Sequence, residues 1–214
     1  MKDINGLLAC LPCGEDVRWD WQGLEKSAFA DIFAKMRSTM QNPAWHAEGD
    51  VWTHTRMVCE ALTEIPDFHR LPIAKKQALS LAALLHDVGK ITRTRLEDGV
   101  LVSPGHGAEG ASVVRKLLWQ EYGMSGTKEK QNFRETVCLI IRYHTAPLHI
   151  IDRTDPQRRA RTVAATGENA DMFDMNMLCM LAEADVRGRI CSDADEKLEI
   201  IALGREAAKE GNSL

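Results

Sequence analysis

The feature that most constrains the fold is an apolar run that ends in two polar side chains. Leu81 to Leu85 are all apolar, and His86 and Asp87 follow them directly. An imidazole and a carboxylate that emerge from a buried helix are costly to desolvate unless a partner compensates them. A divalent metal ion would do so, because side chains about 100° apart around a helix can both reach one ion in a groove between helices. A buried hydrogen bond between His86 and Asp87 is the alternative interpretation.

Two residues shortly after this pair suggest where the helix ends and what lies at the rim of the site. Gly89 fits a helix C-cap, where a positive φ is easily adopted. Lys90 is then expected at the rim of the site as a mobile cation suited to a phosphate group.

Composition excludes several classes of protein. The chain has 214 residues and a formal net charge of −4, so its overall charge does not favour nucleic acid, and any such site would be a local basic patch. It contains no apolar run of the roughly 20 residues that a membrane span needs, and its start lacks the apolar core of a signal peptide. We therefore expect a cytoplasmic protein without membrane association. The six cysteines are scattered, which disfavours a disulfide framework, and we interpret Cys10 and Cys13 as an ordinary loop rather than half of a zinc site.

Apolar periodicity predicts an all-α protein. Helices are expected over residues 23–39, 50–65, 72–88, 104–122, 129–144, 172–187 and 193–210, with Asp50 as an N-cap. The loop over residues 91–107 contains strand-like residues around Val100–Val102. A further basic helix is expected from residue 155 and carries Arg158, Arg159 and Arg161, which form either a solvated face or an anion-binding patch.

Six potential metal ligands are spread over these elements, each on or at the end of a different helix or loop: His54, His86 with Asp87, His106, His144 and Asp185. Imidazole and carboxylate ligands suit a transition metal, Mg²⁺ or Mn²⁺ better than a structural zinc site, which is rich in thiolates. His106 and His144 could complete a second site with Asp87 bridging, and two metals about 3.5–4 Å apart form a clamp for phosphate-ester displacement. Taken alone, His54 would be interpreted as an ordinary core histidine.

The order of these residues resembles the H…HD…D motif of the HD superfamily of metal-dependent phosphohydrolases. In particular, it resembles the HD domain of bacterial CCA-adding tRNA nucleotidyltransferases. The resemblance covers about residues 45 to 190, and its matching segments are residues 49–55, 85–90, 105–111 and 183–189.

The resemblance implies an HD-domain helical bundle with a metal site in its core, formed by residues 45–214, on which residues 1–44 pack as a lead-in and a helix. By the same matching, His54, His86, Asp87 and Asp185 would be metal ligands, and His106 and His144 would be the additional histidines of two-metal members. The relatives of the tRNA-enzyme type imply activity on 2′,3′-cyclic phosphates and 2′-nucleotides. The first 45 residues show no nucleotidyltransferase signature, so we do not expect CCA addition.

The function expected from the sequence is phosphoester hydrolysis with one or two divalent ions per chain (Mg²⁺, Mn²⁺, Ni²⁺, Fe²⁺, Co²⁺ or Zn²⁺). Asp87 and Lys90 are the expected catalytic residues, and Lys90, Arg187 and Arg189 are expected to bind the substrate, although surface ion pairing is the alternative for the two arginines. The expected substrate is a nucleotide or an RNA end, and RNA-repair or tRNA-processing proteins are the expected partners. The rival functions are hydrolysis of nucleoside 5′-monophosphates or dNTPs, and a non-catalytic HD scaffold that binds nucleotide or protein.

Overall fold

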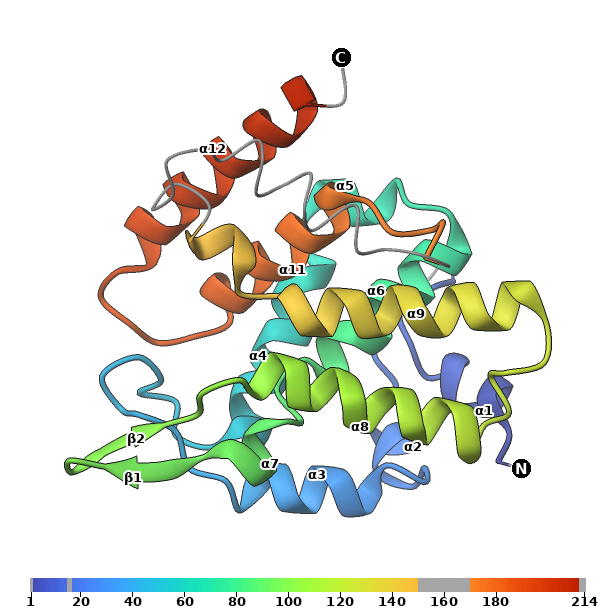
Figure 1. The fold of residues 1–214 in the computed structure, drawn as a ribbon, viewed down its shortest axis with the longest axis horizontal. Helices are drawn as coiled ribbons and strands as arrows, with labels where there is room; N and C mark the ends of the chain where they lie inside the picture. The colour runs from blue at the N-terminus through green and yellow to red at the C-terminus, as the bar shows by residue number, and fades with distance from the viewer. Residues whose placement is uncertain (1, 15–16, 150–169, 212–214) are drawn as a thin grey trace.

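The computed structural model describes residues 2–14, 17–149 and 170–211, which form a bundle of helices and one small β-hairpin (Figure 1). The all-α prediction is therefore confirmed. The main helices are α3 (Ala30–Arg37), α4 (Val51–Thr63), α6 (Ile73–Leu85), α8 (His106–Gln120), α9 (Lys128–Tyr143), α11 (Met175–Arg187) and α12 (Ala194–Gly211). Shorter helices are α1 (Ile4–Leu8), α2 (Trp21–Glu25), α5 (Pro66–His69), α7 (Lys90–Arg93) and the 3₁₀ turn η1 (Ala146–His149).

Helix α6 lies at the centre of the bundle. Every residue from Ala78 to Leu85 is buried, and a helix that is apolar all round is expected to be enclosed on all sides. It packs between α4 and α9, while α8 packs on α9 and α11 packs on α4 (Figure 1). The end of α6 is therefore surrounded by other helices, and the polar residues that follow it enter the core.

The start of α4 is set by a side-chain cap. The carboxylate of Asp50 accepts hydrogen bonds from the backbone N–H groups of Trp52 and Thr53, at 2.9 and 3.0 Å. These N–H groups have no partner inside the helix, so the cap stabilises the first turn. The predicted N-cap is confirmed, and it places His54 one turn inside α4.

The predicted single helix over residues 23–39 is wrong, because the structure has α2 and α3 with a break between them. The hydroxyl of Ser27 donates to the carbonyl of Leu24 at 2.6 Å and accepts from the N–H of Phe29 at 3.1 Å. Serine side chains can replace helical hydrogen bonds in this way. Phe29 is fully buried at the turn. Packing of this ring therefore accompanies the change of direction.

The segment before α2 contacts the main bundle through Trp19. The indole N–H of Trp19 donates to the carbonyl of Cys59 on α4 at 2.9 Å, and the Trp19 ring stacks on Trp21 with centroids 5.2 Å apart. Earlier in this segment, Ile4–Leu8 form α1.

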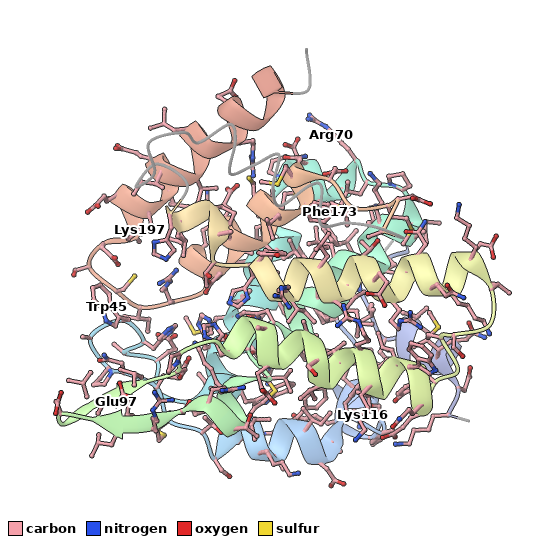
Figure 2. All side chains as sticks on the ribbon, in the orientation of Figure 1. Trp45, Arg70, Glu97, Lys116, Phe173 and Lys197 are labelled. Atoms are coloured by element: carbon pink, nitrogen blue, oxygen red, sulfur yellow. The ribbon has the colours of Figure 1, made fainter. Side chains whose placement is uncertain are left out.

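The strand-like residues around Val100 form β2 (Val100–Val102), which pairs antiparallel with β1 (Arg95–Glu97) in the register Arg95↔Val102. Asp98 and Gly99 connect the strands with positive φ angles of 49° and 79°, as a two-residue hairpin turn requires. The hairpin extends away from the helices, with Glu97 near its tip (Figures 1 and 2).

The basic helix expected to carry Arg158, Arg159 and Arg161 lies outside the described residues. All six cysteines, which lie within the described ranges, are free thiols. Among those ranges, no helix is both long and apolar enough to cross a membrane.

Candidate metal centre

The structure brings all six predicted ligands together in the core. His54 comes from α4, His86 and Asp87 from the end of α6, His106 from the first turn of α8, His144 from the end of α9, and Asp185 from α11. All six are buried except His106, which is partly exposed. Elements far apart in sequence therefore deliver imidazole and carboxylate groups to one small volume.

Asp87 divides this cluster into two groups that share its carboxylate. Its Oδ2 lies 3.4 Å from Nε2 of His86 and 3.7 Å from Nε2 of His54. Its Oδ1 lies 3.4 Å from Nε2 of His106 and 3.8 Å from Nε2 of His144. Each group of three residues is compact enough to hold a metal ion. The geometry therefore fits a carboxylate that bridges two ions.

Three of the histidines are oriented by backbone carbonyls three residues earlier. The Nδ1 atoms of His86, His106 and His144 lie 2.8, 2.8 and 2.7 Å from the carbonyl oxygens of Ala83, Ser103 and Ile141. A carbonyl only accepts, so Nδ1 carries the proton and Nε2 presents a lone pair. All three Nε2 atoms face Asp87, which is the arrangement that metal-binding histidines require.

Unsatisfied buried atoms support the fit of a divalent cation. Nε2 of His54, Nε2 of His86 and Oδ1 of Asp87 have no hydrogen-bond partner among the described residues. Nε2 of His54 lies only 3.1 Å from Oδ1 of Asp185, yet the two atoms are not aligned as a hydrogen bond. Buried polar atoms without partners are costly, and a cation placed between such acceptors would remove that cost. The residues present therefore fit one or two divalent ions.

The protonation states expected of the cluster also favour a cation. Burial raises the pKa of Asp87, but the Lys90 ammonium and the His86 imidazole outweigh it and lower that pKa well below its usual value. Burial likewise raises the pKa of Asp185, and Arg189 and His54 reverse the effect. Both carboxylates are therefore ionised at neutral pH.

The pKa values of the histidines shift in opposite directions. Burial, together with the neighbouring His106 and His86, lowers the pKa of His144 to about 3. Burial also lowers the pKa of His106. For His54, burial lowers the pKa, but Asp185 and Glu48 outweigh it and raise the pKa. His106 and His144 are thus neutral and ready to bind a metal at pH 7, whereas a metal ion at His54 competes with a proton more strongly than at an ordinary histidine.

Lys90 is not the mobile rim cation that the sequence suggested. It is 8 % exposed, and its Nζ lies 2.7 Å from Oδ2 of Asp87 and donates to Oε1 of Gln41 at 2.7 Å. Lys90 therefore belongs to the centre itself, next to the carboxylate that both ligand groups share. Its predicted role in catalysis and substrate binding stays a prediction.

Gly89 is needed for a different reason from the one predicted. Its φ of −67° is ordinary, and it precedes α7 instead of capping a helix with a positive φ, so that prediction is wrong. A Cβ at this position would lie 2.1 Å from the carbonyl oxygen of His106 and 2.6 Å from the nitrogen of Gly110. Glycine lets α8 approach the end of α6 closely, which brings His106 within reach of Asp87.

The two predicted substrate-binding arginines differ in their surroundings. Arg187 is half-exposed and pairs with Glu183 one turn away at 2.9 Å, outside the metal cluster. Helix α11 ends at Arg187, but Arg189 still reaches back, with Nη2 at 3.5 Å from Oδ2 of Asp185. Arg189 thus lies at the centre, and both roles in substrate binding stay predictions.

Three further residues at the centre were not identified from the sequence. Gln41 holds Lys90, and Glu48 contacts both His46 and His54 through Oε1 at 2.8 Å. For His46 and Glu48, the sequence gives one indication of a role at the centre, because both stand shortly before His54 in the chain. Single polar residues before an N-cap are common, so only the folded structure distinguishes them.

This fold and this site define a helical protein with a buried His/Asp centre that can hold divalent metal. The model of the HD domain family matches residues 51–196, more than half of the chain, and the chain belongs to that family. The predicted superfamily is confirmed, and membership suggests a metal-dependent phosphohydrolase. Searches of curated proteins and of solved structures found no match.

Proposed function

We propose that this protein is a metal-dependent phosphohydrolase that acts on a 2′,3′-cyclic phosphate or a 2′-phosphate of a ribonucleotide or an RNA end. The observation that carries the reaction class is the position of Asp87, whose two oxygens face two separate groups of histidines. Centres that hold two ions about 3.5–4 Å apart suit in-line displacement at phosphorus. The substrate choice rests on the resemblance of residues 105–111 and 183–189 to the HD domain of CCA-adding enzymes.

The residues of the centre divide the work between them. Asp87 bridges the two ligand groups, and Lys90 and Arg189 place positive charge beside the two carboxylates, where a phosphoryl group would gain negative charge. A bound divalent ion supplies Lewis acidity toward phosphoryl oxygens and lowers the pKa of water toward about 7. Burial of the ligands excludes bulk water, which strengthens each of these electrostatic interactions.

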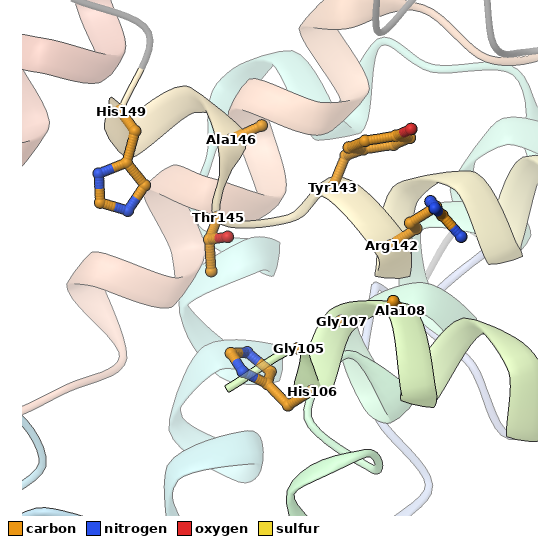
Figure 3. Close-up of a pocket in the computed structure, with 9 residues that line it drawn as sticks. All are labelled: Gly105, His106, Gly107, Ala108, Arg142, Tyr143, Thr145, Ala146 and His149. Carbon is orange, nitrogen blue, oxygen red and sulfur yellow. The ribbon is translucent and has the colours of Figure 1, made fainter. Parts of the chain in front are cut away.

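A cavity next to the centre offers room for the substrate (Figure 3). It has a volume of about 350 Å³ and lies between the start of α8 and the end of α9 with η1. His106 belongs to both the cavity and the metal cluster, and the lining includes Arg142 and His149 but no acidic side chain among the described residues. Ligand pockets usually measure about 300–1,000 Å³, so this one suits a single nucleotide. Its size and charge favour a phosphorylated nucleotide, free or at the end of an RNA.

The experiment that tests the proposal is a substrate screen on the Mn²⁺-loaded protein. We expect release of product from 2′,3′-cyclic AMP and from 2′-AMP, loss of this activity on addition of EDTA, and loss in an Asp87→Asn variant. Arg142→Ala should raise KM for these nucleotides while Mn²⁺ binding stays unchanged, because Arg142 lines the cavity without contacting the ligands.

Two results would change the conclusion. Strong activity on deoxynucleoside 5′-monophosphates or dNTPs, with none on 2′,3′-cyclic or 2′-phosphates, would favour the nucleotidase alternative. A protein that binds Mn²⁺ but hydrolyses no phosphoester in the screen would favour the non-catalytic scaffold.

A further inference from the structure

Glu48 has a buried carboxylate that contacts two histidines near it in sequence and one backbone group far from it. Its side chain is 1 % exposed, and its Oε1 lies 2.8 Å from Nδ1 of His46 and 2.8 Å from Nδ1 of His54. Its other oxygen, Oε2, accepts the backbone N–H of Ile190 at 2.9 Å. A buried carboxylate is costly unless its oxygens have polar partners, and these three contacts supply such partners.

His54 differs from the other three histidines of the centre in how its ring can be held. His86, His106 and His144 stand at helix ends, where a carbonyl three residues earlier is available to their Nδ1 atoms. His54 lies one turn inside α4, where backbone carbonyls serve the helix itself. Its ring must therefore be oriented by a group from outside α4, and Glu48 is that group.

The contact with Glu48 also determines which nitrogen of His54 faces the centre. Because a carboxylate oxygen only accepts, the Nδ1 that faces it carries a proton. Nε2 then points to the opposite side of the ring, 3.1 Å from Asp185 and 3.7 Å from Asp87. Nδ1 of His54 and Glu48 are not aligned as a hydrogen bond, so the contact acts through charge and close approach.

Glu48 further joins His54 to the segment that follows Asp185. The N–H of Ala47 donates to the carbonyl of Ile190 at 3.2 Å, next to the bond between Ile190 and Glu48. These two bonds tie the loop before α4 to the end of α11. These bonds therefore help to fix the distance between the two ligands His54 and Asp185.

We propose that Glu48 is a positioning residue that holds the ring of His54, and with it the first group of metal ligands, in the geometry that binds a divalent ion. This inference rests on the metal centre of the proposed function and not on the identity of the substrate. Partners that orient a metal-binding histidine are commonly worth about 10–100-fold in metal affinity.

The test is a titration of the metal-free 214-residue protein with Co²⁺, in which the d–d absorption of the bound ion is the readout. We expect Glu48→Gln to weaken the Co²⁺ site that contains His54 about 10–100-fold and to change its absorption bands, because the amide lacks the charge that holds the imidazole ring in place. Glu48→Asp keeps the charge but shortens the side chain, so it should recover part of the affinity.

Glu135→Gln is the matched control. Glu135 is also a shielded carboxylate, bonded to Arg115 and Arg134, but it lies on α9 outside the cluster. This variant should lose thermal stability comparable to that lost by Glu48→Gln while Co²⁺ affinity and spectrum stay as in the wild type. Comparison of the two variants separates a loss of metal geometry from a general loss of stability.

A third variant separates Glu48 from its other partner. His46→Ala leaves Glu48 in contact with His54, so Co²⁺ affinity should change less than about 3-fold and the number of bound ions should be unchanged. A loss of one bound ion in His46→Ala would overturn the inference, since His46, Glu48 and His54 would then be ligands of an ion of their own.

Unchanged Co²⁺ affinity and spectrum in Glu48→Gln would also overturn it. Failure of the proposed function would look different, because the wild-type protein would then bind Co²⁺ and respond to Glu48→Gln while hydrolysing no phosphoester.

Discussion

Replacing Gly89 with alanine tests whether close backbone contact assembles the second group of ligands. The new Cβ would lie 2.1 Å from the carbonyl oxygen of His106 and 2.6 Å from the nitrogen of Gly110. Carbon and oxygen atoms approach to about 3.3 Å in close contacts, so the start of α8 would have to move by roughly 1 Å. Both neighbours are backbone atoms, which cannot rotate away as a flexible side chain could.

The movement has two consequences that can be measured. Overpacking of this kind costs about 1–3 kcal/mol, which lowers Tm by roughly 2–4 °C per kcal/mol in a protein of this size. His106 also moves away from Asp87, from which its Nε2 is now 3.4 Å distant. We therefore expect Gly89→Ala to weaken the group of Asp87, His106 and His144 and to spare the group that contains His54 and His86.

Urea unfolding and Co²⁺ stoichiometry are the assays. Gly126→Ala is the control, because a Cβ at Gly126 would meet no atom within 4 Å. The reasoning would be refuted if Gly89→Ala had the stability of the Gly126→Ala protein and bound Co²⁺ with wild-type stoichiometry and affinity.

Three further predictions concern the same centre. First, His86→Ala and Asp87→Ala should lose bound metal and nearly all hydrolysis while circular dichroism shows an intact fold, and full metal occupancy in both would contradict the ligand assignment. Second, His144→Ala should reduce hydrolysis more than it reduces metal occupancy of the group that contains His54 and His86, because His144 belongs to the other ligand group; equal losses in the two measurements would argue against two groups. Third, the metal-free protein should lose stability on acidification, because His144 has a pKa of about 3 when folded but near 6.5 when unfolded, so the unfolded chain binds more protons between these values. The contribution of His144 amounts to about 2 kcal/mol between pH 7 and pH 5, and His54, with its raised pKa, offsets part of it. Urea midpoints in EDTA should therefore fall less with pH in His144→Gln than in the wild type, and an identical pH dependence would contradict this.

The sequence by itself determined the helical class and the set of ligands. Apolar periodicity predicts helices because each must bury one face, and the Asp50 cap is a local interaction that needs no tertiary contact. The six ligands could be selected because only a few residue types bind metals, and in the HD family they recur in a fixed order. They are His54, His86, Asp87, His106, His144 and Asp185. The break between α2 and α3 escaped prediction because Ser27 and the buried Phe29 override a continuous apolar stripe.

Only the tertiary structure decided how these residues work together. The division of the Asp87 carboxylate between two groups of histidines depends on the relative positions of α4, α6, α8 and α9, which no single segment encodes. Gly89 has an ordinary φ, so its role becomes visible only when α8 lies against it. The sequence predicts Lys90 at the rim of the site and does not single out Glu48, because charged side chains are usually solvated. Burial changes this, since a desolvated charge needs partners, and the partners of Lys90 and Glu48 are distant in sequence or belong to the metal centre itself.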